Sequence, residues 1–191
     1  MKFRPVMASL VCLLLACGLL PTGAFSESGP ESQFFILLAN DDGYFAPGLR
    51  ALSEALAPLG QVLIAAPMEN QSGTGHSTTT RRFVRVRPIE LPPGVSGYAI
   101  GARPATCVRL ALESLVPRKP DLVISGINRG TNLGIVTFYS GTVGAAREAA
   151  LVGIPAIAVS MQGDAAEDYA ATAAFVAYLV EELRAEDRLQ P

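Results

Sequence analysis

Two adjacent carboxylates, Asp41 and Asp42, follow an apolar run of strand length at residues 34–39, and Gly43 comes directly after them. In an open α/β sheet, ligands bind at the carboxyl ends of the parallel strands. Two neighbouring aspartates at such a position repel each other and lose hydration, so a cation or hydrogen-bond donors must offset their charge. The pair therefore indicates a site for a hard cation.

Two further polar segments, residues 70–77 and 125–134, each follow a predicted strand, and the second continues to residue 143. They carry amide and hydroxyl oxygens together with glycine. Mg²⁺, Mn²⁺ and Ca²⁺ prefer such oxygen ligands, whereas Zn²⁺ usually recruits His and Cys. Because the ends of parallel strands share one edge of a sheet, we expect these segments to lie beside the aspartate pair.

A phosphate site is predicted where Ser140, Gly141 and Thr142 meet the start of a helix. The exposed N–H groups, the positive end of the helix dipole and two hydroxyls converge there, which favours an anion. The same residues could also act only as a helix cap, and capping is compatible with anion binding. A cation site beside a phosphate site indicates metal-assisted phosphoester hydrolysis.

The elements that must position these residues alternate between apolar strands and helices, a pattern typical of a parallel sheet. The predicted strands are residues 34–39, 62–66, 97–100, 122–125 and 154–160, and the predicted helices are residues 47–58, 104–116, 142–151 and 167–184. Residues 81–87 alternate valine with arginine, which predicts a half-exposed strand. We therefore expect a Rossmann-like α/β fold, a three-layer α/β/α domain with a mostly parallel sheet and one antiparallel hairpin around residues 82–100.

Composition restricts the class of protein. The chain has 191 residues, of which 50% are hydrophobic and 17% charged, so it can form one domain with a core and is not a disordered chain. Its formal net charge of −2 argues against a dedicated binder of nucleic-acid polymers, which usually needs a basic face.

The first 26 residues have the form of a secretory signal peptide. Lys2 and Arg4 precede an uncharged apolar stretch at residues 7–20, and small residues follow. This stretch is short for a membrane span, which needs about 20 residues. We therefore predict a signal peptide over residues 1–26, a tether over residues 27–32, a folded domain over residues 33–191, and export to the periplasm or the medium.

A second interpretation of the leader places a lipid anchor on Cys17, because the residues before it resemble a lipoprotein cleavage box. Removal of residues 1–26 takes away both Cys12 and Cys17, so only Cys107 remains. Cys107 lies in an apolar helical pattern, which indicates a small core residue.

Four segments together resemble one family in order and spacing: ILLANDDG, AAP-x-x-N-x-SGTGHS, PDLVISGINRGTNLG and YSGTVGAAREAALVGIPAIAVS. From about residue 35 to residue 160, the chain is similar to the SurE family of metal-dependent 5′/3′-nucleotidases, also called survival-protein acid phosphatases. The resemblance implies a SurE-like phosphatase domain over residues 33–191 that is incomplete at its C-terminus, because family members continue well beyond this point.

The resemblance also implies the site. The family's ligands for one divalent cation, Mg²⁺ or Mn²⁺ with Ca²⁺ as a further option, correspond to Asp41, Asp42, Ser72 and Asn128. Its phosphate-facing positions correspond to Asn132, Ser140, Gly141 and Thr142. Asp41, Asp42 and Asn128 are then the catalytic residues, with Asn40 bracing the loop. The implied substrate is a nucleoside monophosphate, and the implied assembly is a homodimer or tetramer.

Two mechanisms remain open at this point. A metal-activated water can attack phosphorus while the cation and backbone N–H groups stabilise the equatorial oxygens. Alternatively, Asp41 can act as a nucleophile and form a phospho-enzyme. Non-catalytic alternatives are an inactive truncated remnant or a metal- and phosphate-binding module of receiver type. Ser125 and Asn128 count against the latter, because a receiver carries a phosphoacceptor aspartate there.

Several charged or variant positions bear on substrate. His76, the only histidine, is a candidate acid, base or loop-orienting residue, and Arg129 is a candidate for steering phosphate. Thr106 stands where the family has aspartate, and Ile135 and Val136 replace a region that is often acidic. The remaining arginines of this region are interpreted as a solvated strand face that could guide an anionic substrate: Arg81, Arg82, Arg85 and Arg87.

Overall fold

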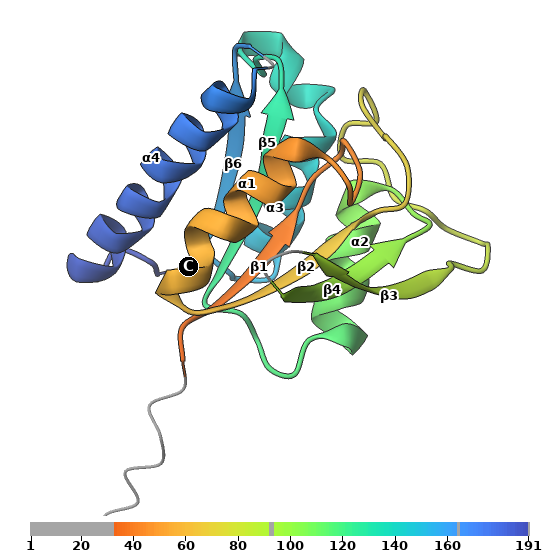
Figure 1. The fold of residues 1–191 in the computed structure, drawn as a ribbon. Helices are drawn as coiled ribbons and strands as arrows, with labels where there is room; N and C mark the ends of the chain where they lie inside the picture. The colour runs from red at the N-terminus through yellow and green to blue at the C-terminus, as the bar shows by residue number, and fades with distance from the viewer. Residues whose placement is uncertain (1–32, 92–93, 164, 191) are drawn as a thin grey trace, which may run out of the picture. The chain divides into compact units, whose positions relative to one another are not determined.

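The computed structural model describes residues 33–91, 94–163 and 165–190, whose centre is a twisted six-stranded sheet (Figure 1). The strand order is β3-β4-β2-β1-β5-β6, and all neighbouring strands are parallel except β3 and β4. The strands are β1 (Phe35–Ala39), β2 (Gln61–Pro67), β3 (Val86–Leu91), β4 (Val95–Ile100), β5 (Leu122–Arg129) and β6 (Ala156–Met161). The predicted sheet, mostly parallel with one antiparallel hairpin, is confirmed.

Helices cover both faces of the sheet and complete three layers (Figure 1). The α-helices are α1 (Pro47–Leu56), α2 (Pro104–Leu110), α3 (Gly141–Leu151) and α4 (Ala166–Ala185). Two short 3-10 segments, η1 (Ala57–Leu59) and η3 (Gly134–Phe138), and a π turn, η2 (Ala111–Leu115), complete the set. Helices α1 and α4 pack on one face, and α2 and α3 pack on the other.

Strand β1 lies in the middle of the sheet, and all five of its residues are fully buried. Successive side chains alternate between the two faces of a strand. Ile36 and Leu38 therefore join the core under α1 and α4, while Phe35 and Leu37 join the core under α2 and α3. Since burying each such side chain contributes about 1.5–3 kcal/mol, the position of β1 and of the aspartates that follow it is strongly fixed.

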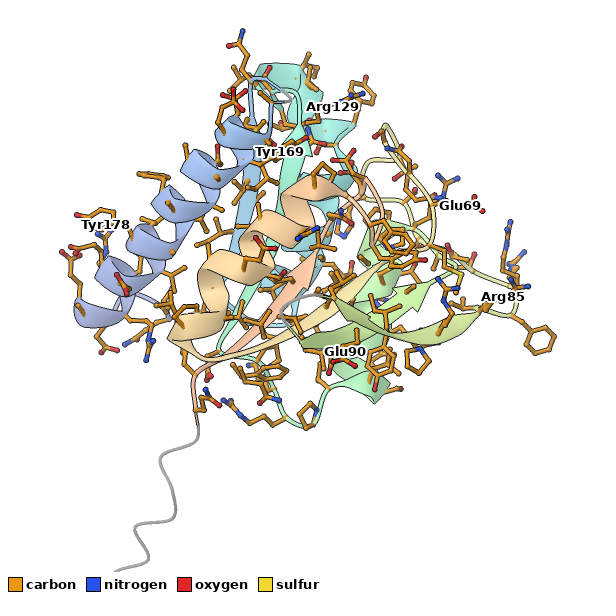
Figure 2. The ribbon with its side chains drawn as sticks, viewed as in Figure 1. Glu69, Arg85, Glu90, Arg129, Tyr169 and Tyr178 are labelled. Carbon is orange, nitrogen blue, oxygen red and sulfur yellow. The ribbon has the colours of Figure 1, made fainter. Side chains whose placement is uncertain are left out.

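The register of the parallel strands brings the polar segments to one edge. Leu38 of β1 pairs with Ile64 of β2, and Ala39 pairs with Ser125 of β5. The loops that follow these three strands consequently leave the sheet at the same edge, as the sequence predicts. Arg129 and Tyr169 lie near this edge in Figure 2. Both residues line one hollow there.

The strand predicted at residues 81–87 is wrong in its position. The observed strand β3 begins at Val86 and continues to Leu91, and residues 81–85 form a loop. Arg81 adopts a φ of 56°, which is incompatible with an extended strand. Pro88 can lie inside β3 because β3 is the edge strand and no neighbour requires the missing N–H on its outer side.

Strand β5 is longer than predicted and runs to Arg129 instead of ending at Ser125. After a register irregularity, it pairs with β6 through Asn128 opposite Ser160 and Arg129 opposite Met161. Asn128 is thereby placed on a strand end rather than in a loose loop.

The N-terminal predictions fall outside the described residues, and this applies to the signal peptide of residues 1–26 and the tether of residues 27–32. Among the helices of the described part, none is long and apolar enough to cross a membrane.

Candidate functional site

The loop after β1 is held by Asn40, as the sequence predicts. The fully buried Asn40 donates from Nδ2 to the Gly43 carbonyl oxygen at 2.8 Å and accepts from the Gly43 N–H at Oδ1 at 3.3 Å. Gly43 has a φ of 104°, a backbone conformation that favours glycine. This closed turn positions both aspartates at the end of the central strand.

Asp41 lies directly against the start of α3. Its side chain is 2% exposed, and its Oδ1 accepts a hydrogen bond of 2.5 Å from the Thr142 hydroxyl. A Cβ atom at Gly141 would lie 2.7 Å from Asp41 Cβ and 2.9 Å from its Oδ2, so only glycine permits this approach. The predicted cation site and the predicted phosphate site are therefore adjacent.

Asp42 is partly buried and receives two hydrogen bonds from neighbouring segments. The Arg129 backbone N–H donates to Oδ2 and the Asn70 side-chain amide donates to Oδ1, each at 3.3 Å. Burial, followed by the charge of Asp41, raises the pKa of the Asp42 carboxyl, while these donors lower it by less. The folded protein thus holds Asp42 at an electrostatic cost that a bound cation would relieve.

The start of α3 has the features of an anion site. Ser140 caps the helix by accepting the Val143 N–H at its Oγ at 3.1 Å, and Ser140, Gly141 and Thr142 are all buried. The first N–H groups of an α-helix have no partner within the helix and carry the positive end of its dipole. The structure directly supports the interpretation of Ser140 as a helix cap. It is also compatible with an anion site at the same place.

Ser72 and Asn128 come from the two other loops. The Gln71 N–H donates to the Asp41 carbonyl oxygen at 2.7 Å, and the exposed Ser72 follows Gln71 directly. Asn128 is 8% exposed and uses its Nδ2 to donate to the Gly130 carbonyl oxygen at 2.7 Å. In the described part of the chain its Oδ1 accepts no hydrogen bond, so this oxygen is available to a cation.

Asn132 is placed differently from the other phosphate candidates. Its side-chain amide donates to Ser160 Oγ on β6 at 2.8 Å, which fixes it near the end of β6. Over residues 33–91, 94–163 and 165–190 no hydrogen bond joins Asn132 to Ser140 or Thr142. Its role toward phosphate stays a prediction.

The donor set fits a hard divalent cation on the chemistry of its groups. Asp41 and Asp42 make no ion pair with a lysine, arginine or histidine in the described residues, so no cationic side chain pairs with them directly. The surrounding donors are carboxylate, amide and hydroxyl oxygens, and this region of the described chain contains no cluster of three or more His, Cys, Asp or Glu residues. That inventory matches Mg²⁺, Mn²⁺ or Ca²⁺ rather than Zn²⁺.

A second polar cluster, which sequence reasoning missed in part, centres on Glu148 of α3. Its side chain is 2% exposed and accepts from Arg109 Nε at Oε1 at 2.5 Å, while its Oε2 lies 2.7 Å from His76 Nε2. A Cβ at Gly144 would lie 2.5 Å from the Gly75 carbonyl oxygen, so the His76 loop lies directly on α3. A glutamate that stands alone in the alanine-rich sequence of α3 is the sequence feature that could have pointed to this cluster.

Asp42 also borders an open hollow of about 260 Å³ at the edge of the sheet. Asn70, Arg129 and Tyr169 contribute to its lining. Because this hollow reaches the carboxylate from solvent, it provides access to the site, and the exposed Arg129 stands beside the entry.

Comparison with known proteins gives one consistent result. The family model described as "Survival protein SurE" matches residues 36–189. The chain is 52% identical over 150 residues to the 5′-nucleotidase SurE of Desulfitobacterium hafniense (strain DSM 10664 / DCB-2) and 50% identical over 150 residues to that of Geotalea daltonii. Each alignment covers 78% of this chain and 59% of the relative, so the chain spans about three fifths of the length of these proteins.

A solved structure shows the same likeness. The crystal structure of the SurE protein from Aquifex aeolicus superimposes with a TM-score of 0.69 at 42% sequence identity. The superposition covers 78% of this chain and 59% of that chain.

Proposed function

Because the chain belongs to the survival protein SurE family, we propose that it is a divalent-metal-dependent phosphomonoesterase that hydrolyses nucleoside monophosphates. The names of its relatives, 5′-nucleotidase SurE, support this reaction class. The observation that carries the proposal is the contact between Thr142 and Asp41, which joins the helix start suited to phosphate and the carboxylates suited to a cation.

Asp41, Asp42, Ser72 and Asn128 would hold the cation, with Mg²⁺ or Mn²⁺ as the leading candidates. When bound, such a cation supplies positive charge to phosphoryl oxygens and makes a water molecule more acidic. Asp42 contributes a carboxylate that borders the hollow, and Asn128 contributes an amide oxygen that accepts no hydrogen bond within the described residues.

The phosphate would lie at the start of α3, where N–H groups of the first turn lie beside the Ser140 and Thr142 side chains. There the N–H groups of the first turn and the Ser140 hydroxyl would bind the equatorial oxygens and stabilise the charge of the transition state. The Thr142 hydroxyl has a different task, since it donates to Asp41 Oδ1 and fixes the orientation of that carboxylate. Asp41 Oδ2 remains beside Gly141, where it can accept a proton from an attacking water or, in the alternative mechanism, attack phosphorus itself.

The test measures phosphate release from AMP and other nucleoside monophosphates in Mn²⁺, Mg²⁺ and EDTA. We expect release with metal, none above background with EDTA, and loss of release in Asp42→Asn with the fold retained. Soluble, folded protein that releases no phosphate with any of these metals would contradict the proposal and favour a non-catalytic or inactive chain. Trapping of acid-stable radiolabel on the wild type but not on Asp41→Asn would select the nucleophilic mechanism.

We also propose that the chain is exported, on the basis of the leader pattern at residues 1–26. Sequencing of the mature N-terminus distinguishes the two forms of processing. A start near residue 27 supports a cleaved signal peptide, whereas a lipid-modified Cys17 supports an anchored lipoprotein.

A further inference from the structure

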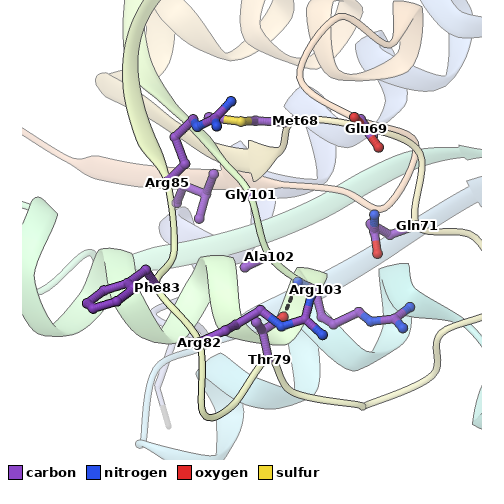
Figure 3. A pocket seen from close by; sticks show the side chains of 11 residues that line it. Met68, Glu69, Gln71, Thr79, Arg82, Phe83, Arg85, Gly101, Ala102 and Arg103 are labelled. Atoms are coloured by element: carbon purple, nitrogen blue, oxygen red, sulfur yellow. Dashed lines mark hydrogen bonds between the residues drawn. The ribbon is translucent and has the colours of Figure 1, made fainter.

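A pocket of about 410 Å³ lies between the loop of residues 68–85 and the start of α2 (Figure 3). Three arginine side chains line it: Arg82 and Arg85 from the loop, and Arg103 from the residue before α2. Arg82 and Arg103 also border an adjoining hollow of about 200 Å³ with three threonines of residues 78–80. We refer to the pocket and the hollow together as the basic recess. The strand predicted at residues 81–87 gave no indication of it.

The backbone that carries these arginines is fixed by hydrogen bonds across the recess. The Thr79 N–H donates to Thr106 Oγ1 at 2.7 Å. The Arg103 N–H donates to Thr79 Oγ1 at 3.0 Å, and this bond is the dashed line in Figure 3. The Gly101 N–H donates to the Arg85 carbonyl oxygen at 2.8 Å. The loop is thus joined to the segment before α2 and to α2 itself, and Arg82 and Arg103 lie on one side of the pocket with Arg85 on the other, beside Met68 (Figure 3).

The charge of the recess is not neutralised by the protein. In the part of the chain that the structure describes, the guanidinium groups of Arg82, Arg85 and Arg103 make neither an ion pair nor a hydrogen bond. The acidic residue that lines the pocket is Glu69, so cations outnumber anions there. Arginine offers a planar fork of N–H donors that matches phosphate, and clustered arginines without partners favour an anion that bears several oxygens.

The recess adjoins the candidate active site on two sides. Gln71, which lines the pocket, donates its N–H to the Asp41 carbonyl oxygen at 2.7 Å. Arg103 immediately precedes Pro104, and Pro104 Cγ lies 3.1 Å from where a Cβ of Gly141 would stand. The recess therefore lies next to both the loop after β1 and the start of α3.

We propose that the recess is a second anion-binding subsite, which takes a second phosphate group of a substrate whose scissile phosphate lies at Ser140–Thr142. The proposal rests on the proposed phosphomonoesterase function. Its chemical class of substrate is a nucleoside that carries two separate phosphate groups. The arginines bind and orient the phosphate that is not cleaved, while the residues at the start of α3 bind the one that is.

The test compares adenosine 3′,5′-bisphosphate with AMP as substrates of the full chain with Mn²⁺. We expect a higher kcat/KM for the bisphosphate, and we expect the ratio of the two values to fall about tenfold in Arg82→Gln and in Arg103→Gln, the scale of one hydrogen bond to a charged group. Arg81→Gln is the matched control, because Arg81 lies in the same loop and is exposed but does not line the pocket. Equal ratios in the wild type, the control and both recess variants would overturn the proposal.

A binding measurement separates failure of the subsite from failure of the enzyme function. Calorimetric titration of adenosine 3′,5′-bisphosphate in EDTA does not require turnover, and we expect its affinity to weaken about tenfold in Arg82→Gln and Arg103→Gln but not in Arg81→Gln. Absent AMP hydrolysis together with this pattern would refute the phosphomonoesterase and leave the anion site standing. If inorganic phosphate alone shows the arginine dependence and the bisphosphate shows none, the recess binds free anions and the substrate subsite is refuted.

Discussion

The Thr142 hydroxyl donates to Asp41 Oδ1 at 2.5 Å, across 101 residues of sequence and between two buried side chains. This bond joins the end of the central strand β1 to the first turn of α3. It means that the groups suited to holding a cation and the groups suited to binding phosphate form one unit. A change at either end of the bond should therefore affect both.

Replacing Thr142 by valine keeps the shape of the side chain and removes its hydroxyl. In the described residues, the Asp41 carboxylate accepts a side-chain hydrogen bond from Thr142 alone, so its orientation is then set less firmly. We expect kcat/KM for AMP to fall about 10²-fold, the scale for loss of one preorganised donor. Thr142→Ser retains the hydroxyl and should keep most of the activity. Activity of Thr142→Val within threefold of the wild type, on the order of 1 kcal/mol or less, would exclude this role.

Asp42→Asn should raise stability in EDTA while it weakens the response of stability to metal. The pKa of Asp42 is raised by burial and by Asp41, so the ionised form is disfavoured in the folded state, and stability decreases as the pH rises through the folded pKa. An uncharged asparagine avoids this cost at pH 7. We expect a higher Tm by a few degrees, the shift that about 1 kcal/mol produces in a domain of this size.

The same thermal measurement in Mn²⁺ supplies the contrast. Wild-type protein should gain about 2.7 kcal/mol when the metal concentration is 100 times its Kd, whereas Asp42→Asn should gain much less. An equal gain in both proteins would show that Asp42 is not a ligand.

We expect Asp121 to contribute to the free energy of unfolding at neutral pH and to lose this contribution at acid pH. Burial is the largest single influence and would raise the pKa of Asp121, but the Arg118 side chain and the Phe35 N–H together lower it below its usual value. A lowered pKa in the folded state contributes stability above the unfolded pKa, and this contribution is lost as the pH falls through the folded pKa. Since the Asp121 side chain is 40% exposed, we expect a contribution below about 1 kcal/mol.

Urea unfolding of wild type and Asp121→Asn between pH 7 and pH 2.5 measures this contribution. The difference in unfolding free energy should be constant near neutral pH and vanish at the acid end. Glu186→Gln is the control, because Glu186 pairs with Arg188 on the surface with 55% of its side chain exposed. If the difference in unfolding free energy between wild type and Asp121→Asn grew on acidification, the prediction would be wrong.

Glu148→Ala should destabilise the fold more than removal of a surface glutamate. Glu148 is buried and bonded to both His76 and Arg109, whereas Glu54 pairs with Arg50 at 46% exposure. We expect about 2 kcal/mol for Glu148→Ala, the scale of a lost hydrogen bond between charged groups, and less than about 0.5 kcal/mol for Glu54→Ala. Chemical denaturation of both variants provides the measurement, and equal losses would assign Glu148 no special contribution.

The fold was largely predictable because its signals are local. The apolar run at residues 34–39 and the capped start of α3 at Ser140 each depend on neighbours in sequence, and both were placed correctly. The strand at residues 81–87 was misplaced because an alternation of valine and arginine can also occur in an extended loop, where every second side chain faces solvent. The positive φ of Arg81 and the hydrogen bond from Gly101 to Arg85 arise from contacts that alternation does not encode.

The sequence by itself determined which chemical groups are present and where along the chain they stand: two carboxylates after a buried strand, and hydroxyls at the start of a helix. Only the tertiary structure decided which of them meet. Packing of α3 against the end of β1 brings Thr142 to Asp41, and packing of the loop of residues 68–85 against the segment before α2 places three arginines around one pocket. The physical reason is that hydrophobic periodicity and helix capping depend on residues close together in sequence. These contacts instead join residues far apart in sequence, and they form only when helices pack onto both faces of the sheet.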